Sequence, residues 1–283
     1  MIPVAFDYVR PSTVEDAVAA VAAGGDEAKI LAGGQSLLPV LRLRLAAPAL
    51  LVDLGGVGSL RGARFDSGAL VIGAMTTHAE VASSALVRAE APLVATAAAH
   101  VGDRQVRHLG TLGGSLAHAD PAGDLPAVAV ALDADMVLAG PSGRRTVAAR
   151  DFFTDIFTTA LGPAEVLVEV RFPRMSGWTG GYEKFHRTLQ AWALVGVAAA
   201  VRKENGSIAE ARVAFTNMGP TPVRASSVEA ALVGAADLGA VKAAAAHAGE
   251  GTSPPTDISG SAEYRRHLAG VLTARAVASA AGF

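Results

Sequence analysis

Residues 110–126 read GTLGGSLAHADPAGDLP, a run of small, polar and conformationally special residues between two helical stretches. Such a segment adds little to a core and offers many hydrogen-bonding groups, so we expect a loop that wraps a polar ligand. Two of its residues have simpler alternative roles. Asp124 is also suited to cap a helix from Leu125 to Leu132. His118, next to Asp120, suggests acid–base chemistry, but without a nucleophile or metal partner it fits better as a histidine that bonds its own loop.

A second glycine-rich turn lies near the N-terminus, where residues 30–36 read ILAGGQS. A strand runs into two glycines and then into a helix, so backbone amides can approach an anion without side-chain obstruction. The positive end of the helix and the Ser36 hydroxyl make the turn suitable for a pyrophosphate. The pattern is neither G-x-G-x-x-G nor a P-loop with its lysine, so neither class of site is indicated. A purely structural strand–helix turn remains the alternative.

Composition excludes several classes of protein. The 283 residues suit two or three domains, and 24 basic against 26 acidic residues give a net charge of −2, so no basic field favours nucleic acid. The chain has no cysteine, which excludes disulfides, a thiol nucleophile and an iron–sulfur cluster held by this chain alone. His100, His108 and His118 have no recognised ligand spacing, so we expect no metal site.

The apolar runs are too short to cross a membrane. Ala191–Val201 has eleven residues, below the ~18 that a span needs, and the first residues do not resemble a signal peptide. We therefore expect a cytoplasmic protein, with attachment to the inner face of the membrane through partners left open.

The periodicity of the chain predicts an α+β fold in three parts, residues 1–56, 57–176 and 177–283. In the first, Ser12 and Glu15 predict a capping box for a helix that ends at Gly24, followed by strands at 29–32 and 50–54. The middle part has helices at 77–87, 92–100 and 125–132 and strands at 69–74, 135–139 and 165–172. In the last part, strands at 182–186, 192–202 and 212–217 precede helices at 228–233, 240–247 and 264–281, and Asn205-Gly206 predicts a hairpin.

These motifs resemble a known family. Residues 32–39, AGGQSLLP, with Val52-Asp53-Leu54 are similar to the first flavin-binding segment of the FAD-binding medium subunits of molybdenum hydroxylases, the carbon monoxide dehydrogenase and xanthine dehydrogenase type. Residues 110–121 with 124–126 resemble the second such segment, and the likeness extends over essentially the whole chain. The lack of cysteine excludes the branch of the family whose extra loop carries another iron–sulfur cluster.

The resemblance implies a two-subdomain FAD-binding fold of the vanillyl-alcohol-oxidase/p-cresol-methylhydroxylase type, plus a C-terminal α+β domain of antiparallel strands and then helices. It implies non-covalent FAD, with the first segment around the pyrophosphate and the second at the phosphates and ribityl chain. It further implies Asp124 at a sugar or ribityl hydroxyl, Leu167 near the adenine, Lys184 at the polar edge of the flavin and Val101 in an apolar contact. It implies no catalytic residue and no metal ligand. The cofactor-binding residues so implied are Lys29, Ile30, Leu31, Ala32, Gly33, Gly34, Gln35, Ser36, Val101, Thr111, Gly113, Gly114, Ser115, Asp124, Leu167 and Lys184.

The function implied by the resemblance is electron transfer. A large molybdopterin subunit would oxidise the substrate, and [2Fe-2S] clusters of a small subunit would pass electrons to FAD on this chain and then to an external acceptor. Together these subunits would form a dimer of heterotrimers. Two alternatives remain open at this point: a stand-alone FAD oxidase or dehydrogenase of the same fold, and a flavin-free interaction or storage subunit that uses the glycine segments structurally.

Overall fold

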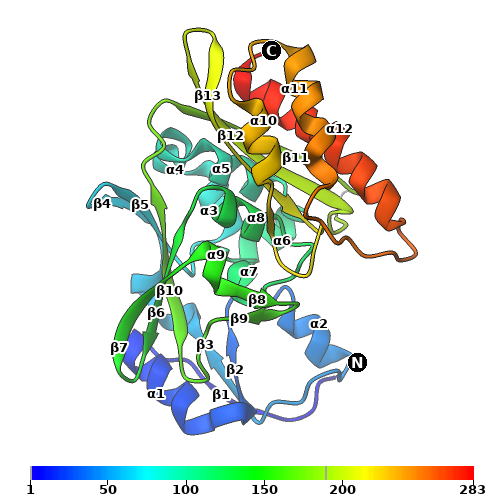
Figure 1. The fold of residues 1–283 in the computed structure, drawn as a ribbon. Coiled ribbons are helices and arrows are strands. Elements are labelled where there is room, and N and C mark those ends of the chain that lie inside the picture. The colour runs from blue at the N-terminus through cyan, green and yellow to red at the C-terminus, as the bar shows by residue number, and fades with distance from the viewer. Residues whose placement is uncertain (1, 189) are drawn as a thin grey trace.

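The computed structural model describes residues 2–188 and 190–283. Three main β-sheets follow one another along the molecule, from the blue N-terminal elements at one end to the yellow and red C-terminal elements at the other (Figure 1). The mixture of helices with mainly antiparallel sheets agrees with the predicted α+β class. Among the described residues, no helix combines the length and the apolar content needed to cross a bilayer.

The N-terminal sheet has three parallel strands in the order β1-β3-β2. The predicted cap of its first helix is wrong by one residue. The N-cap is Thr13, whose extended backbone lets its Oγ1 accept from the N–H of Asp16 at 3.1 Å, so Ser12 and Glu15 form no capping box. The elements here are β1 (Asp7–Val9), α1 (Val14–Gly24), η1 (Gly25–Glu27), β2 (Ala28–Leu31), α2 (Leu37–Arg42), β3 (Leu50–Asp53), η2 (Leu54–Gly56) and η3 (Gly58–Leu60).

The middle sheet has five antiparallel strands in the order β4-β5-β10-β6-β7. Its central strand, β10, comes from a part of the chain about a hundred residues after β4 and β5, so the sheet closes only when distant segments meet. The strands are β4 (Ala63–Asp66), β5 (Ala69–Gly73), β6 (Asp135–Gly140), β7 (Gly143–Ala148) and β10 (Val166–Pro173). A short hairpin of β8 (Phe153–Asp155) and β9 (Thr158–Thr159) lies beside them.

The helices of the middle part differ from prediction in several places, since α6, α7 and α9 were not expected as helices. The helix expected over 77–87 is two helices, because Ser84 is extended and its hydroxyl caps the second one by accepting from Val87 N–H at 3.3 Å. All eight residues of α8 are buried, as expected for a helix that is apolar all round. The helices are α3 (His78–Ser83), α4 (Ala85–Glu90), α5 (Pro92–Ala99), α6 (Arg104–Leu109), α7 (Leu112–His118), α8 (Asp124–Ala131) and α9 (Ala149–Phe152).

The C-terminal sheet is antiparallel, in the order β11-β12-β13-β14. The predicted hairpin is confirmed: Asn205 and Gly206 both have positive φ, 49° and 86°, as a tight turn between twisted strands requires. Residues 192–194, expected as strand, precede β12. The elements are β11 (Trp178–Phe185), β12 (Val195–Glu204), β13 (Ser207–Thr216), β14 (Val223–Arg224), α10 (Ser226–Leu232), α11 (Leu238–Ala245), η4 (Ala246–Gly249) and α12 (Ala262–Ala281).

The strand β12 is buried on both faces, which explains its unbroken apolar sequence. Ala198 and Ala200 face the main core, which is built from the middle sheet together with α3, α4, α5, α7, α8 and α9. Val197 and Val201 face a second core, beneath α12. The C-terminal sheet is therefore fixed directly against the helices that carry the glycine-rich segment, and this contact positions the residues of β11 described below.

Candidate functional site

The turn between β2 and α2, residues 32–36, is pressed against the end of α6. A Cβ on Gly33 would lie 2.2 Å from the carbonyl oxygen of Leu109, so only glycine fits at this position. Gly34 has φ of +73°, which also favours glycine. Gln35 folds back and donates from Nε2 to the carbonyl oxygen of Gly33 at 3.0 Å. The close approach fixes the path of the turn.

The backbone amides of this turn are unpaired. In the part of the chain that the structure describes, the N–H groups of residues 33–36 donate to no protein acceptor, and the Ser36 hydroxyl makes no cap hydrogen bond to α2. All of these residues are only half-buried. Successive unpaired amides in a tight turn form a concave anion site, and a buried N–H without a protein acceptor needs water or a ligand. The turn can therefore hold an anionic group, as its sequence predicts.

Residues 112–118 of the second glycine-rich segment form helix α7, so the prediction of a loop is wrong for this part. Thr111 is the N-cap, and its Oγ1 accepts from the N–H of Gly114 at 3.1 Å. The two preceding amides donate to the carbonyl oxygens of Thr76 and Ala74, at 3.0 and 2.8 Å, and the N–H of Ser115 donates to Thr111. Because the first four amides of α7 are paired with protein, ligand contacts from this segment depend on its side chains.

The glycines of α7 serve close packing. A Cβ on Gly113 would lie 2.4 Å from Cβ of Ala74, so this glycine lets the helix rest on the segment after β5. A Cβ on Gly114 would lie 3.3 Å from Cβ of Ala32, so the two glycine-rich segments are neighbours. The hydroxyl of Ser115, half-buried, makes no hydrogen bond within the described residues.

Asp124 lies at the start of α8 and is not its cap. Gly123 is the N-cap, and the Asp124 carboxylate turns away from its own helix toward β11. It accepts from the hydroxyl of Tyr182 at 2.5 Å and from Nζ of Lys184 at 2.8 Å. The side chains of Asp124 and Lys184 are only 3% and 2% exposed. The helix-cap alternative is therefore wrong, and the residue instead anchors a buried ion pair.

Burial dominates the electrostatics of this cluster. It raises the pKa of Asp124, while the ammonium group of Lys184 opposes that shift by favouring the carboxylate. Burial, together with the negative charge of Asp124, raises the pKa of Tyr182 well above its usual value of 10.0. Lys184 also donates to the carbonyl oxygen of His100 at 3.3 Å. The cluster thus joins α8, β11 and the end of α5.

The other predicted site residues lie at different depths. Lys29 is exposed on β2, whereas Ile30 and Leu31 are half-buried and Ile30 packs against the N-terminal core. Leu167 is 4% exposed within β10, inside the main core. Val101 is half-buried beside the same core. Their contacts with a ligand stay predictions.

His118 is the last residue of α7, and its side chain lies near residues that follow the helix. Its Nε2 lies 4.0 Å from Oδ2 of Asp120, and its ring packs on Phe157 with centroids 5.0 Å apart. Partial burial lowers the pKa of His118, and the charge of Asp120 opposes this shift. At 4.0 Å the two atoms are too far apart for a hydrogen bond, so both interpretations of His118 stay predictions.

Sequence reasoning missed His78, which lies 3% exposed behind the second glycine-rich segment. A Cβ on Gly110 would lie 2.9 Å from its ring. Its Nδ1 is buried and has no hydrogen-bond partner among the described residues. Burial, with a smaller contribution from the charge of Arg107, lowers its pKa to about 4. Nothing in the local sequence separates this histidine from an ordinary helix residue, since its burial comes from segments distant in the chain.

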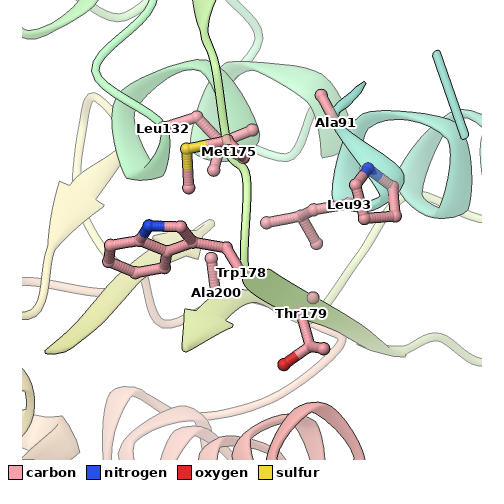
Figure 2. Close-up of a pocket in the computed structure, with 9 residues that line it drawn as sticks. Ala91, Leu93, Leu132, Met175, Trp178, Thr179 and Ala200 are labelled. Carbon is pink, nitrogen blue, oxygen red and sulfur yellow. The ribbon is translucent and has the colours of Figure 1, made fainter. Parts of the chain in front are cut away.

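The cavity in Figure 2 lies between α5, the end of α8 and β11. Leu93, Met175 and Trp178 line it, with neighbouring small residues. It has a volume of about 10 Å³, barely enough for one water molecule, and its lining is apolar. It is a gap in the packing and not a cofactor site.

Two family models match the chain. Residues 4–175 match the FAD binding domain in molybdopterin dehydrogenase, and residues 181–280 match the CO dehydrogenase flavoprotein C-terminal domain. The chain belongs to this family of FAD-binding subunits of molybdenum hydroxylases. FAD is therefore the cofactor of the domain that contains both glycine-rich segments.

Individual relatives match over nearly their whole length. The chain is 43% identical to the carbon monoxide dehydrogenase medium chain of Hydrogenophaga pseudoflava, covering 99% of this chain and 98% of the relative. A crystal structure of a Cu,Mo-CO dehydrogenase superposes with a TM-score of 0.96 at 40% identity, covering 100% and 99% of the two chains. Quinoline 2-oxidoreductase of Pseudomonas putida 86 superposes with a TM-score of 0.94 at 36% identity, with the same coverage. These likenesses confirm the predicted fold and the predicted role as an oxidoreductase subunit.

Proposed function

We propose that the chain carries non-covalent FAD as the electron-transfer subunit of a molybdenum hydroxylase. A small subunit with [2Fe-2S] clusters delivers electrons to it, a large molybdopterin subunit oxidises the substrate, and an external acceptor takes the electrons away. The names of the relatives as medium chains support small and large partner subunits. We further propose a dimer of such heterotrimers in the cytoplasm.

The unpaired amides of residues 33–36 are the observation that carries the site. They lie on a half-buried turn, next to α7, and they offer adjacent donors for the pyrophosphate of FAD. On α7, which is next to the turn, the Ser115 hydroxyl would be a donor for the ribityl chain. FAD, when bound, supplies the redox chemistry, and the chain supplies its position and electrostatic surroundings.

The buried cluster of Asp124, Tyr182 and Lys184 holds one ammonium group, that of Lys184, in a fixed place beside the proposed flavin site. Asp124 holds the ammonium group of Lys184 through a 2.8 Å hydrogen bond and leaves it little freedom to turn. We propose that Lys184 meets the polar edge of the flavin and that Asp124 also accepts from a ribityl or sugar hydroxyl. A carboxylate has about four lone-pair sites, so two existing donors leave room for a third.

The three predicted parts of the chain supply different walls of this site. We propose boundaries after residues 56 and 176, because the three-stranded, five-stranded and four-stranded sheets each fall inside one of the ranges so defined. The two glycine-rich segments come from the first and second parts, and Lys184 comes from the third. FAD binding would accordingly tie all three together.

The substrate is set elsewhere in the complex. Relatives named for carbon monoxide, glyceraldehyde and caffeine are 43%, 36% and 37% identical to this chain. The sequence identity therefore does not distinguish relatives that are named for different substrates. We infer that this subunit serves a conserved electron-transfer step while the large subunit determines which molecule is oxidised.

The role of the turn is tested by a pair of glycine variants. Gly34→Ala strains a residue with φ of +73° inside the proposed site, and Gly234→Ala strains one with φ of +85° far from it, in the link between α10 and α11. We expect Gly34→Ala to weaken FAD binding by about tenfold or more in a flavin titration, on the scale of lost charge-assisted hydrogen bonds. Gly234→Ala should retain the wild-type dissociation constant. Equal FAD affinity in both variants would remove the turn from the site.

A further inference from the structure

A groove runs between α11 and α12 on the outer side of the C-terminal part, where Figure 1 shows both helices in orange and red. Its volume is about 640 Å³. On α12 it is lined by Gly270, Ala274 and Ala278, which repeat every four residues and so lie on one helix face. Leu238 of α11 and Phe283 add larger apolar side chains. A Cβ on Gly270 would lie 3.3 Å from the carbonyl oxygen of Ala245, so this glycine serves the packing of α11 on α12. The small side chains of Ala274 and Ala278 leave room in the rest of the groove.

The groove is also basic. Lys242, Arg266, His267 and Arg275 line it, and the described residues of its lining include no aspartate or glutamate. Lys242, Arg266 and Arg275 are exposed and form no ion pair within the described part of the chain. The whole chain has a net charge of −2, so this cluster is a local feature and not a consequence of overall composition. An occupant of matching chemistry is acidic on its flanks and apolar in its centre.

One end of the groove is held in place before any partner arrives. The N–H of Phe283 donates to the carbonyl oxygen of Ala278 at 3.1 Å. Nζ of Lys203 lies 4.2 Å from the centre of the Phe283 ring and donates to the carbonyl oxygen of Ala281 at 2.8 Å. This anchoring keeps an aromatic side chain at the groove, so less ordering is needed on binding.

We propose that this groove docks an acidic amphipathic helix of a partner polypeptide. From Arg266 to Ala278 it extends for about 18 Å along α12, at about 1.5 Å per residue, which matches three turns of a helix. Apolar side chains of the helix would enter between α11 and α12, and its carboxylates would face the arginines and the lysine, as in other helix-in-groove complexes. This docking site is separate from the proposed flavin site.

Two other occupants fit less well. A bilayer surface is broad and flat, whereas the small residues Gly270 and Ala274 are half-buried inside a concave groove. A second copy of this chain would need a free acidic amphipathic helix. The acidic helix α1 buries its apolar residues Val14, Ala17 and Val21 in the N-terminal core, so it cannot offer them.

The direct test uses the full-length, FAD-loaded chain and a synthetic helical peptide of about four turns, with leucines on one face and glutamates beside them. Fluorescence anisotropy gives its dissociation constant at low and high salt. We expect measurable binding that weakens as salt rises, because the ion pairs are exposed. The same peptide with lysine in place of each glutamate should bind more weakly, by about tenfold or more.

Two variants separate charge from shape. Arg266→Glu with Arg275→Glu reverses the charge of the groove and should weaken the acidic peptide about tenfold or more. Ala274→Leu fills the groove without changing any charge and should also weaken it. Arg144→Glu, at an exposed arginine on β7, is the control and should leave binding unchanged. Flavin absorbance and the melting temperature establish that each variant is folded.

Three results would overturn the docking site: equal binding of the acidic and basic peptides, unchanged binding in both groove variants, or no peptide binding together with arginine-dependent binding to phosphatidylglycerol vesicles. The last result would assign the groove to a membrane surface. FAD content is measured on the same samples, so a failure of the groove is distinguished from a failure of flavin binding.

Discussion

At the scale of single residues, the ion pair of Asp124 and Lys184 is notable because both charges are buried. Both side chains are almost fully buried, so each charge depends on the other for its stabilisation. The two residues are 60 positions apart and lie on α8 and β11. Their resemblance to family positions pointed to each one separately, but no local pattern could predict that they bind each other.

Removing one partner should expose this dependence. We expect Lys184→Met to destabilise the chain by about 3–5 kcal/mol, because it leaves the Asp124 carboxylate buried and unpaired. Denaturant unfolding with and without added FAD measures the loss. The double variant Lys184→Met with Asp124→Asn should recover most of it, since neither charge then remains. A double variant no more stable than the single one would contradict the ion-pair account.

His78 makes a prediction about acid stability. Its pKa in the folded chain is about 4, below the ordinary 6.5, so between these pH values the unfolded chain binds a proton that the folded chain does not. This residue should therefore lower the free energy of unfolding by about 3 kcal/mol as pH falls from 6.5 to 4, and by no more below that. Its contribution is fully favourable above pH 6.5.

The matched variant is His78→Leu, which is apolar and leaves no unpaired Nδ1. Denaturant unfolding at several pH values should show a shallower loss of stability between pH 6.5 and 4 than in the wild type. Identical pH dependence of the two proteins would exclude His78 as the source.

At the scale of elements, α7 shows why local sequence misled the prediction. Its two glycines and its polar residues favour a loop by propensity. The helix forms because Thr111 caps it and because the carbonyl oxygens of Ala74 and Thr76 accept from its first amides. These acceptors come from a segment almost forty residues earlier, so tertiary contacts override propensity. In contrast, the Asn205-Gly206 hairpin and most strands of the C-terminal sheet were predictable, because their signals are local.

The packing of α7 predicts that Gly113 is needed for the stability of the fold, in addition to the cofactor contact that the resemblance implies. Gly113→Ala should destabilise the chain itself by about 1–3 kcal/mol, since its Cβ would meet Ala74 at 2.4 Å. Gly58→Ala, in η3, is the control, because a Cβ at that position would meet nothing within 4 Å. Melting temperatures of FAD-free protein provide the comparison. Weaker FAD binding by Gly113→Ala at unchanged FAD-free stability would show that the glycine serves the ligand directly.

At the scale of the whole molecule, the two glycine-rich segments decide the fold and the cofactor. Their resemblance to the flavin-binding segments of one family indicated the α+β architecture and FAD, and both are confirmed. The paired amides of α7 and the unpaired amides of residues 33–36 were not predictable, because they depend on which distant carbonyl oxygens each segment meets. The first segment therefore has amides that no protein group uses, whereas the amides of the second hold α7 against its neighbours.

The most direct test of the account is the flavin content of the purified chain after denaturation. Acid or heat precipitation of the protein should release one FAD per chain into the supernatant, because the cofactor is held without a covalent bond. Adding FAD back to the cofactor-free chain should raise its melting temperature as the free ligand concentration increases. Flavin that stays with the precipitate, or a melting temperature that FAD does not change, would contradict the account.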